Sequence, residues 1–299
     1  MVKTISKKSK NNEAKMSKSV VKEMSKSWII ETRFKEWQVL QYAKISIKNP
    51  ILIEGMPGIG NVGKICMDLL IEDLKAELLM TFFSHNLPNS VFVNEDNLVS
   101  LPRISLYHKK ISGQDFLFLT GDVQPITENS SYEFSELIVE LFINNSGKYI
   151  VTLGGIGLPE IPDTPRVFLT GNDKKFVEGM SSLMEKKKLR HDTKIYGMVG
   201  PILGVSGLLL GVSKNYDLKA FSLLAETFGH PVYVGLKGSK AILQILNGLF
   251  KLGFNFDKLD KEIKQIDAQM AGIGDSDLSE GTKDKVVKYR KYSDVNYIG

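Results

Sequence analysis

Short apolar runs alternate with amphipathic segments through the middle of the chain. Five runs have an apolar core of four to seven residues and end near Gly, Pro, Asn or Asp, as buried strands do. Five longer segments repeat apolar residues every three or four positions, which is typical of helices packed on one side. The predicted strands are 51–54, 77–83, 115–120, 149–153 and 194–198, and the predicted helices are 62–74, 132–142, 176–189, 239–252 and 257–270. This alternation predicts an α/β fold, a three-layer αβα sandwich with a mostly parallel or mixed sheet.

The two ends of the chain differ in composition from the middle. Residues 1–27 carry eight lysines against two acids, a balance of +6 that leaves −1 for the other 272 residues of a chain with net charge +5. Dense apolar residues begin at Trp28, and a glycine-rich stretch followed by polar residues comes after Met270. We therefore predict a basic disordered leader over 1–27, one α/β domain over 28–271 and a flexible tail over 272–299.

The composition narrows the classes of protein to consider. Apolar residues make up 42% and charged residues 24% of the 299 residues, close to ordinary soluble usage. No apolar run reaches the roughly 18 residues of a membrane span, no secretory h-region is present, and Cys66 is the single cysteine. We expect a cytoplasmic protein without a membrane partner. The near-neutral body argues against specific nucleic-acid binding, although the lysine leader could contact phosphates without specificity.

The last predicted helix carries the clearest apolar stripe, with Asp257 placed to cap it. The stripe is too short to indicate a coiled coil, so we expect it to pack on the domain's own sheet, with self-association as the alternative. A homo-oligomer is accordingly among the expected partners. The stripe consists of Phe256, Leu259, Ile263, Ile266 and Met270.

A glycine-rich loop between a predicted strand and a predicted helix carries two nucleotide-binding patterns. Gly58, Gly60 and Gly63 form G-x-G-x-x-G, which could bring backbone N–H groups and a helix dipole to a phosphate. The acid that a dinucleotide site needs about 20 residues later is absent from 81–86. The second pattern runs from Gly58 to Lys64, but an isoleucine follows in place of the Ser or Thr that would hold magnesium. We favour a close-packed strand-to-helix turn over a phosphate site.

Other candidate chemistry is sparse. The glycine clusters at 153–159 and 197–211 either line a pocket at the edge of the sheet or form close-packed turns. The four histidines lie far apart and show no metal-ligand spacing. Ser206 is preceded by Gly204 and Val205, which does not match a nucleophile elbow. We therefore predict no catalytic residues, no metal and no cofactor.

Taken together, these segments resemble the PAC2 family of proteasome assembly chaperones, particularly its archaeal branch. The resemblance implies an α/β fold related in shape to purine nucleoside phosphorylases, and binding of proteasome α-subunits rather than catalysis. It covers about 51–270 and rests on four blocks in order, with some likeness also at 240–243. The blocks are 54–64, 152–157, 204–211 and 223–227.

The resemblance also implies a role for the C-terminus. Members of this branch are thought to dock on the α-ring through a terminal hydrophobic-Tyr-any motif. This chain ends Tyr297-Ile298-Gly299, so its tyrosine is third from the end and not second. We take these three residues as the candidate partner-binding site.

Two functions follow as hypotheses. The first is a cytoplasmic, non-enzymatic assembly chaperone or adaptor that binds 20S proteasome α-subunits, in part through the C-terminal tail. The alternative is an enzyme or sensor that binds a nucleotide-like ligand through Gly58, Gly60, Gly63 and Lys64. Calorimetry with nucleotides would separate them.

Overall fold

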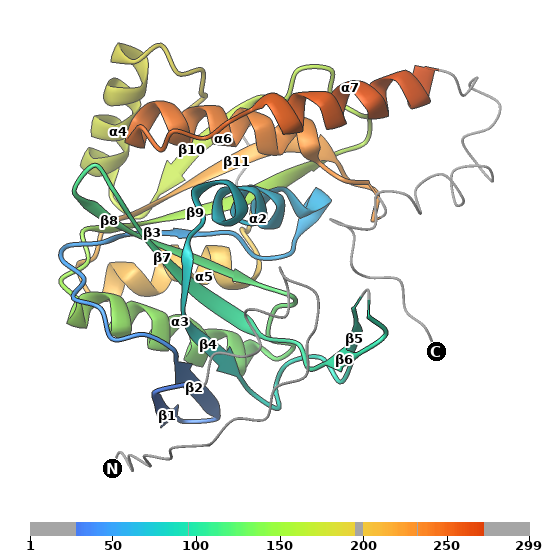
Figure 1. Ribbon diagram of the computed structural model, residues 1–299. Helices are drawn as coiled ribbons and strands as arrows, with labels where there is room; N and C mark the ends of the chain where they lie inside the picture. Colours follow the sequence, from blue (N-terminus) through green and yellow to red (C-terminus); the bar gives the residue numbers. More distant parts are fainter. Residues whose placement is uncertain (1–27, 95, 195–199, 232, 272–299) are drawn as a thin grey trace.

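A nine-stranded mixed sheet runs through the part of the chain that the computed structural model describes, which is residues 28–94, 96–194, 200–231 and 233–271 (Figure 1). The strand order is β1-β2-β4-β7-β8-β3-β9-β11-β10. The strands are β1 (Ile30–Phe34), β2 (Trp37–Gln41), β3 (Ile51–Glu54), β4 (Glu77–Phe83), β7 (Ile104–Ile111), β8 (Gln114–Gly121), β9 (Tyr149–Leu158), β10 (Val167–Gly171) and β11 (Ala220–Phe228).

The centre of this sheet is parallel and its flanks are antiparallel. Strands β8, β3, β9 and β11 run in one direction, and the remaining neighbours pair antiparallel. All four residues of β3 are buried, as expected for a strand between two parallel neighbours with helices on both faces. We call the edge where these four strands end the carboxyl edge, and the opposite edge the amino edge.

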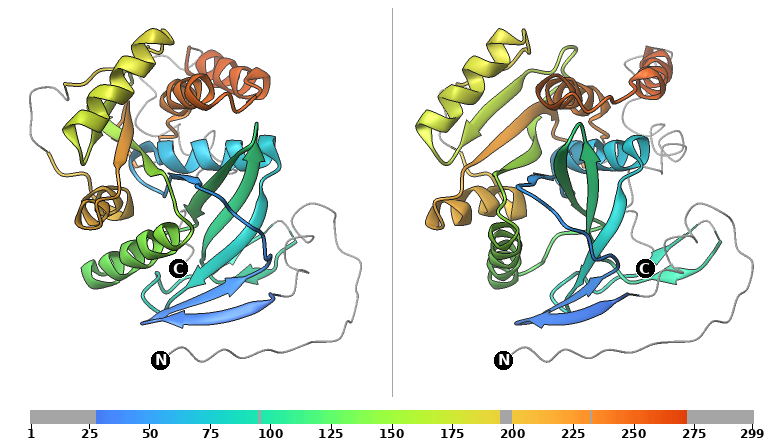
Figure 2. Two further views of the ribbon diagram at one scale, coloured as in Figure 1. Left: turned by 90° about the vertical axis from the view of Figure 1, so that its left-hand side faces the viewer. Right: turned by 60° about the vertical axis from the view of Figure 1, so that its left-hand side comes forward.

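Helices cover both faces of the sheet. One face holds α2 (Val62–Leu74), α4 (Lys174–Lys186), α6 (Leu236–Phe250) and α7 (Asp257–Ala271); the other holds α3 (Glu128–Asn144) and α5 (Gly204–Asn215) (Figure 2). Each face has its own hydrophobic core, because alternate residues of one strand point to opposite sides. On β3, Ile53 belongs to the first core and Leu52 to the second. The predicted three-layer α/β sandwich is confirmed, with a mixed sheet.

The last helix, α7, packs mainly on a neighbouring helix. Its Leu259 is buried in the core that α6 shares, and ion pairs join Lys237 to Asp267 and Lys240 to Asp260. Phe256, Ile263 and Ile266 of the stripe are partly buried against the same core, so these residues pack within the chain, and the side chain of Met270 lies outside the described residues.

Most predicted elements are present. Helix α2 and strands β3 and β4 have the predicted bounds, and the other helices differ by a few residues at their ends. The predicted strand 194–198 lies outside the described residues except for Lys194, which is in no strand. Five strands of the large sheet were not predicted: β1, β2, β7, β10 and β11.

The glycine cluster 197–211 was interpreted wrongly over its second half. Residues 204–215 form helix α5, which buries Val205, Leu209 and Val212. Glycine lowers helix propensity, so the pattern indicated a loop. At Gly207 a side chain would collide with the Ile202 carbonyl, which explains a glycine inside this helix.

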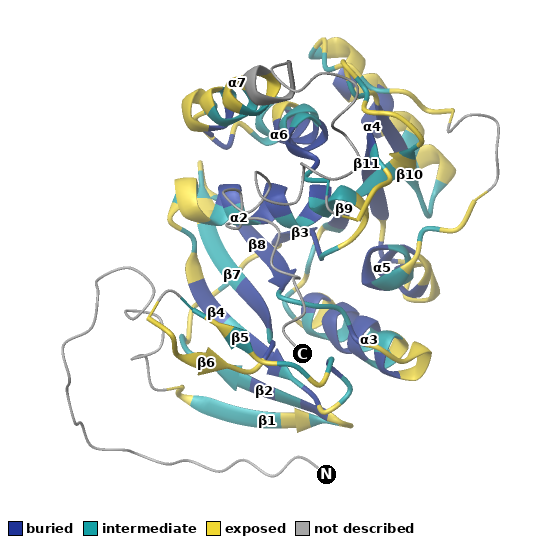
Figure 3. Cartoon of the chain, turned by 90° about the vertical axis from the view of Figure 1, so that its right-hand side faces the viewer, coloured by how far each residue is buried: buried dark blue, intermediate teal, exposed yellow. Residues whose placement is uncertain are grey.

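A small hairpin leaves the sheet between β4 and β7, at the carboxyl edge. It consists of β5 (Phe92–Val93) and β6 (Val99–Ser100), which pair only with each other among the described strands. Figures 1 and 3 show it standing away from the body. Within the described residues, no helix has the length and apolar character to cross a bilayer.

Candidate functional site

The glycine-rich loop joins β3 to α2 at the carboxyl edge, as predicted. A short 3-10 turn, Ile59–Asn61, makes the connection, and helix α2 begins at Val62. Two consecutive residues are left-handed, with φ of 60° at Gly60 and 51° at Asn61. A side chain at the first position would be strained by its backbone alone, and asparagine tolerates the second.

Neighbouring strands and helix α6 press closely on this turn. A Cβ at Gly60 would lie 2.5 Å from the Thr227 Oγ1 of β11, and one at Gly155 would collide with the Ile59 carbonyl. The Gly235 N–H donates a hydrogen bond of 2.8 Å to the Gly60 carbonyl. The glycines therefore allow β9, β11 and α6 to approach the turn.

The remaining loop candidates face different surroundings. A Cβ at Gly63 would lie 2.5 Å from the Leu153 carbonyl, whereas one at exposed Gly58 would meet nothing within 4 Å. Lys64 forms an ion pair with Asp68 one turn along α2, with Nζ 2.6 Å from Oδ1. Burial raises the pKa of Asp68, although the Lys64 charge opposes that shift. The lysine is thus directed along its own helix, and the geometry favours a close-packed turn. Ligand binding by these residues stays a prediction.

A buried glutamic acid ends strand β3 directly before the loop. Glu54 is fully buried and its Oε1 accepts hydrogen bonds from the Ser206 hydroxyl at 2.9 Å and the Met56 N–H at 3.1 Å. Burial raises the pKa of Glu54 to about 8, and those two hydrogen bonds only partly offset the effect. The carboxyl group is therefore neutral at pH 7.

Polar groups continue from Glu54 across the neighbouring strands. The register places Thr152 of β9 beside Glu54 and Ser222 of β11 beside Thr152, all on the face that α5 covers. The Ser222 hydroxyl donates to the Thr152 carbonyl at 3.2 Å. In this row Glu54 is bonded to α5 through Ser206, and Ser222 is bonded to the neighbouring strand β9.

Two further side chains lock the carboxyl edge. The Gln124 amide donates to the Pro57 carbonyl at 2.6 Å and accepts from the Val205 N–H at 2.9 Å, so it joins the glycine loop to α5. Glu226 of β11 is buried and accepts from Arg166 Nε at 2.8 Å, with a second guanidinium nitrogen at 2.7 Å. Both guanidinium nitrogens contact Oε1, and the Arg166 N–H donates to Oε2 at 2.9 Å, so Glu226 is held at both of its oxygens.

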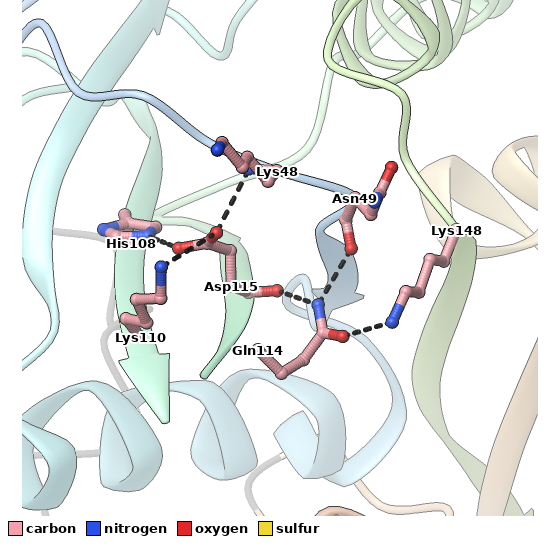
Figure 4. A network of polar contacts seen from close by, with 7 residues as sticks. All are labelled: Lys48, Asn49, His108, Lys110, Gln114, Asp115 and Lys148. Carbon is pink, nitrogen blue, oxygen red and sulfur yellow. Dashed lines mark hydrogen bonds and ion pairs between the residues drawn. The ribbon is translucent and has the colours of Figure 1, made fainter. Parts of the chain in front are cut away.

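The amino edge carries a charged network instead (Figure 4). Asp115 of β8 accepts from His108 Nε2 at 2.8 Å and from the Lys48 N–H at 3.1 Å, and Lys110 Nζ lies 3.9 Å away. Burial alone would raise the pKa of Asp115, but these hydrogen bonds and positive charges hold it below its ordinary value. The full network is Lys48, Asn49, His108, Lys110, Gln114, Asp115 and Lys148.

The described part of the chain has a surface hollow away from the glycine loop and no cluster of metal-ligand side chains. A surface hollow of about 550 Å³ follows β10 and α4, where Thr170, Asn172 and Ser181 line it, away from the glycine loop. Within the described ranges, no three His, Cys, Asp or Glu side chains gather as metal ligands would. Cys66 is buried on α2, and burial raises the pKa of its thiol.

Sequence reasoning missed the residues that organise the carboxyl edge. Glu54 and Ser206 are 152 positions apart, and Arg166 and Glu226 are 60 apart. The available signal for the first pair was an acid at the end of an otherwise apolar buried strand. Tyr297, Ile298 and Gly299 lie outside the described residues.

Comparisons with known proteins agree with this fold. A model of the PAC2 family matches residues 52–273. The structure is similar to that of Pyrococcus furiosus PbaB, an archaeal proteasome activator, with a TM-score of 0.72 and 29% identity over 80% of this chain and 99% of PbaB. Pyrococcus furiosus PbaA, an archaeal homolog of proteasome-assembly chaperone, has a similar fold, with a TM-score of 0.65 and 23% identity over 87% of this chain and all of PbaA.

Two uncharacterized proteins of Methanocaldococcus jannaschii are also similar in sequence. One is 25% identical over 253 residues, which cover 85% of this chain and 93% of that protein. The other is 29% identical over 248 residues, which cover 82% of this chain and 94% of that protein. In each case the match covers more than four fifths of this chain.

Proposed function

This chain belongs to the PAC2 family, and on that basis we propose that it is a non-enzymatic assembly chaperone or adaptor that binds the α-subunits of the 20S proteasome in the cytoplasm. The observation that carries the proposal is the likeness to PbaB, which extends over 99% of that proteasome activator at 29% identity. Likeness of this extent covers the folded body and not one motif. The fold of PbaA points the same way.

The chemistry of the carboxyl edge supports a binding role rather than catalysis. Glu54 is neutral and has a hydroxyl and a backbone N–H as its hydrogen-bond donors, while Glu226 is held by Arg166. Acid–base catalysis needs a group placed to exchange protons with a substrate. Buried groups that serve strand and helix ends instead suit a rigid scaffold.

We place the α-subunit contact of the tail at Tyr297, Ile298 and Gly299. The composition of residues 272–299 predicts a flexible segment, and a flexible segment of 28 residues has a root-mean-square reach of about 30 Å, enough for Tyr297 and Ile298 to reach a surface beside the body. Tyrosine is a rigid amphipathic anchor, and isoleucine adds apolar contact. Such anchors commonly contribute about 2 kcal/mol or more.

Binding to purified α-subunits tests both levels of the proposal. We expect the full chain to bind, deletion of Tyr297–Gly299 to weaken binding at least tenfold, and Asn296→Ala to have no effect as the neighbouring control. Lack of binding by the full chain would overturn the proteasome role. Full binding by the deletion would overturn only the tail mechanism and move the interface to the body.

The nucleotide hypothesis has its own test in calorimetry with a panel of nucleotides. Binding at micromolar concentration that Gly60→Asp abolishes, without loss of the fold, would favour a ligand-binding enzyme or sensor. We expect no such binding, because the glycines of the loop already serve contacts with β9, β11 and α6.

A further inference from the structure

A serine and a histidine outside the sites described so far form a hydrogen-bonded pair. Ser181 lies on α4, and its Oγ is 2.8 Å from Nε2 of His191, while Nδ1 of the same ring lies 3.0 Å from the Leu189 carbonyl. A carbonyl oxygen can only accept, so these partners assign the hydrogen of the neutral ring to Nδ1 and leave Nε2 as the acceptor. The Ser181 hydroxyl therefore donates to the histidine.

The backbone after α4 holds this ring in place. Lys188 is left-handed, with a φ of 56°, and the next N–H, that of Leu189, donates to the Met184 carbonyl at 2.9 Å, as in a Schellman motif. Asp192 follows the histidine directly, and its carbonyl accepts from the Leu169 N–H of β10 at 2.7 Å. The carbonyl that orients the imidazole is thus fixed by the end of the helix, and the histidine is fixed by the edge of the sheet.

Ser181 opens onto the surface hollow beside β10 and α4. The residue is 9% exposed and lines the hollow, whose volume of about 550 Å³ has room for a small organic molecule. Leu169 and Val177 give the hollow apolar side chains, whereas Thr193 and Lys174 give it hydrogen-bond donors. A ligand in the hollow would therefore meet the serine hydroxyl together with groups that can stabilise negative charge.

The arrangement is that of an activated nucleophile. A serine hydroxyl is a weak nucleophile until a neighbouring base takes its proton, and a third group commonly orients that base. Here His191 is placed as the base, and the Leu189 carbonyl orients it from the position that a carboxylate has in the Ser-His-Asp triad. The serine and the histidine are ten positions apart and meet only because α4 ends between them.

We propose that Ser181 is a reactive serine that accepts an acyl group from small carboxylic esters bound in this hollow. Its Oγ forms a bond to the ester carbonyl carbon while its proton passes to Nε2 of His191. The bond from that carbon to the ester's alkoxy oxygen then breaks, and the proton moves from Nε2 to the departing oxygen. The products are an acyl-serine and an alcohol, and no other reactant is needed. This reaction modifies the chain once, and it does not depend on α-subunit binding.

Acetylation of the full chain by p-nitrophenyl acetate tests the proposal. After an acid quench, peptide mass spectrometry measures the rate at each serine separately from the rates at lysines. Ser182 is the matched control within the same chain, because it is exposed and lines the same hollow. We expect Ser181 to be acetylated about 100-fold faster than Ser182 or more. His191→Gln keeps a polar side chain but has no base, so it should remove this advantage, whereas His85→Gln should leave it unchanged.

Three outcomes would overturn the proposal. Equal rates at Ser181 and Ser182 would show that the first hydroxyl is an ordinary one, and acetyl groups on lysines alone would show that neither serine reacts. An unchanged rate at Ser181 in a folded His191→Gln variant would mean that the histidine only ties down the end of α4. The comparison of the two serines needs no substitution, so it decides the reactivity of Ser181 even if His191→Gln does not fold.

Discussion

The two edges of the large sheet each bury a carboxyl group, and the two groups differ in charge at neutral pH. Glu54 is neutral, whereas Asp115 is ionised. Glu54 at the carboxyl edge is fully buried, and Asp115 at the amino edge is 2% exposed. Yet the pKa of Glu54 is raised to about 8, while that of Asp115 is lowered. Glu54 lies much deeper in the protein than Asp115, which is covered by few atoms at the end of the sheet, so the depth of burial and the partners together set the difference in pKa.

Those partners differ in number and charge. Glu54 has a hydroxyl and one backbone N–H on Oε1, and within the described residues its Oε2 has no hydrogen-bond partner. Asp115 receives His108 on one oxygen and a backbone N–H on the other, with Lys110 nearby. Around Glu54 the carboxyl edge is thus assembled from neutral groups and close backbone packing, with the Arg166–Glu226 ion pair further along it, whereas charged groups surround Asp115 at the amino edge.

The largest effect should come from breaking the close packing at the carboxyl edge. Gly60→Val combines a left-handed backbone with a collision against Thr227, so we expect a loss of about 3–5 kcal/mol in the free energy of unfolding. Gly58→Val is the matched control two positions away, since its backbone is extended and a Cβ meets nothing within 4 Å. Urea unfolding measures both.

If Gly60→Val does not fold, Gly60→Ala gives the same comparison with a smaller loss. Equal stability of the Gly58 and Gly60 variants would contradict the packing interpretation of the loop. Unchanged stability at Gly60 with loss of a bound nucleotide would support the alternative function.

The next largest change in stability should come from the neutral carboxyl group of Glu54. Because the folded pKa of Glu54 lies above its ordinary value of 4.5, the folded state binds the proton more tightly, and stability falls as pH rises from about 4.5 through about 8. Glu54→Gln stays neutral, so it should be more stable than the wild type by about 4 kcal/mol at pH 8 and nearly equal to it at pH 4. Urea unfolding at the two pH values measures this difference; a constant difference would refute the neutral state.

The effect of Asp115 on the pH dependence of stability should have the opposite sign to that of Glu54 and be smaller. Its folded pKa is lowered, so its contribution to stability is present at neutral pH and is lost as pH falls through the acid range. Asp115→Asn should lose about 1–2 kcal/mol at pH 7, because His108 and the Lys48 N–H face different carboxylate oxygens and one of these becomes an NH2 group that cannot accept. Near pH 2 the variant and the wild type should converge, and a loss that is the same at both pH values would mean that charge plays no part.

The sequence allowed prediction of what depends on local pattern. Helix α2 and strand β3 have strong periodicity and clear ends, and the glycine turn between them was expected at that position. Strand β11 was missed because Ser222, Glu226 and Thr227 interrupt its apolar residues, although the whole strand except its last residue is buried. Ser222 and Glu226 are buried there with partners from elsewhere in the chain, the Thr152 carbonyl and Arg166.

The same reasoning explains why the two buried carboxyl groups were not predicted. The neutral state of Glu54 follows from its burial, and its contact with Ser206 requires α5, whose glycines indicated a loop. The sequence pattern places Asp115 only at the start of a strand, because its hydrogen-bond partners, His108 and Lys48, come from different segments of the chain. Pairings between distant residues decide the chemistry, and a single sequence does not show them.

The smallest effect should follow removal of residues 1–27. Their eight lysines and few apolar residues cannot bury enough surface to offset an ordering entropy of about 1–2 kcal/mol per residue. A chain that begins at Trp28 should therefore melt at the temperature of the full chain, within error. Its stability should also depend on pH as that of the full chain does. Glu54 should still lower stability as pH rises and Asp115 should still raise it, because the groups that set both effects lie within 48–206. Calorimetric melting at pH 4 and pH 8 measures all three points. A fall of several degrees at both values would show that the leader stabilises the body, and a fall at one value alone would show that its positive charge acts on one edge of the sheet.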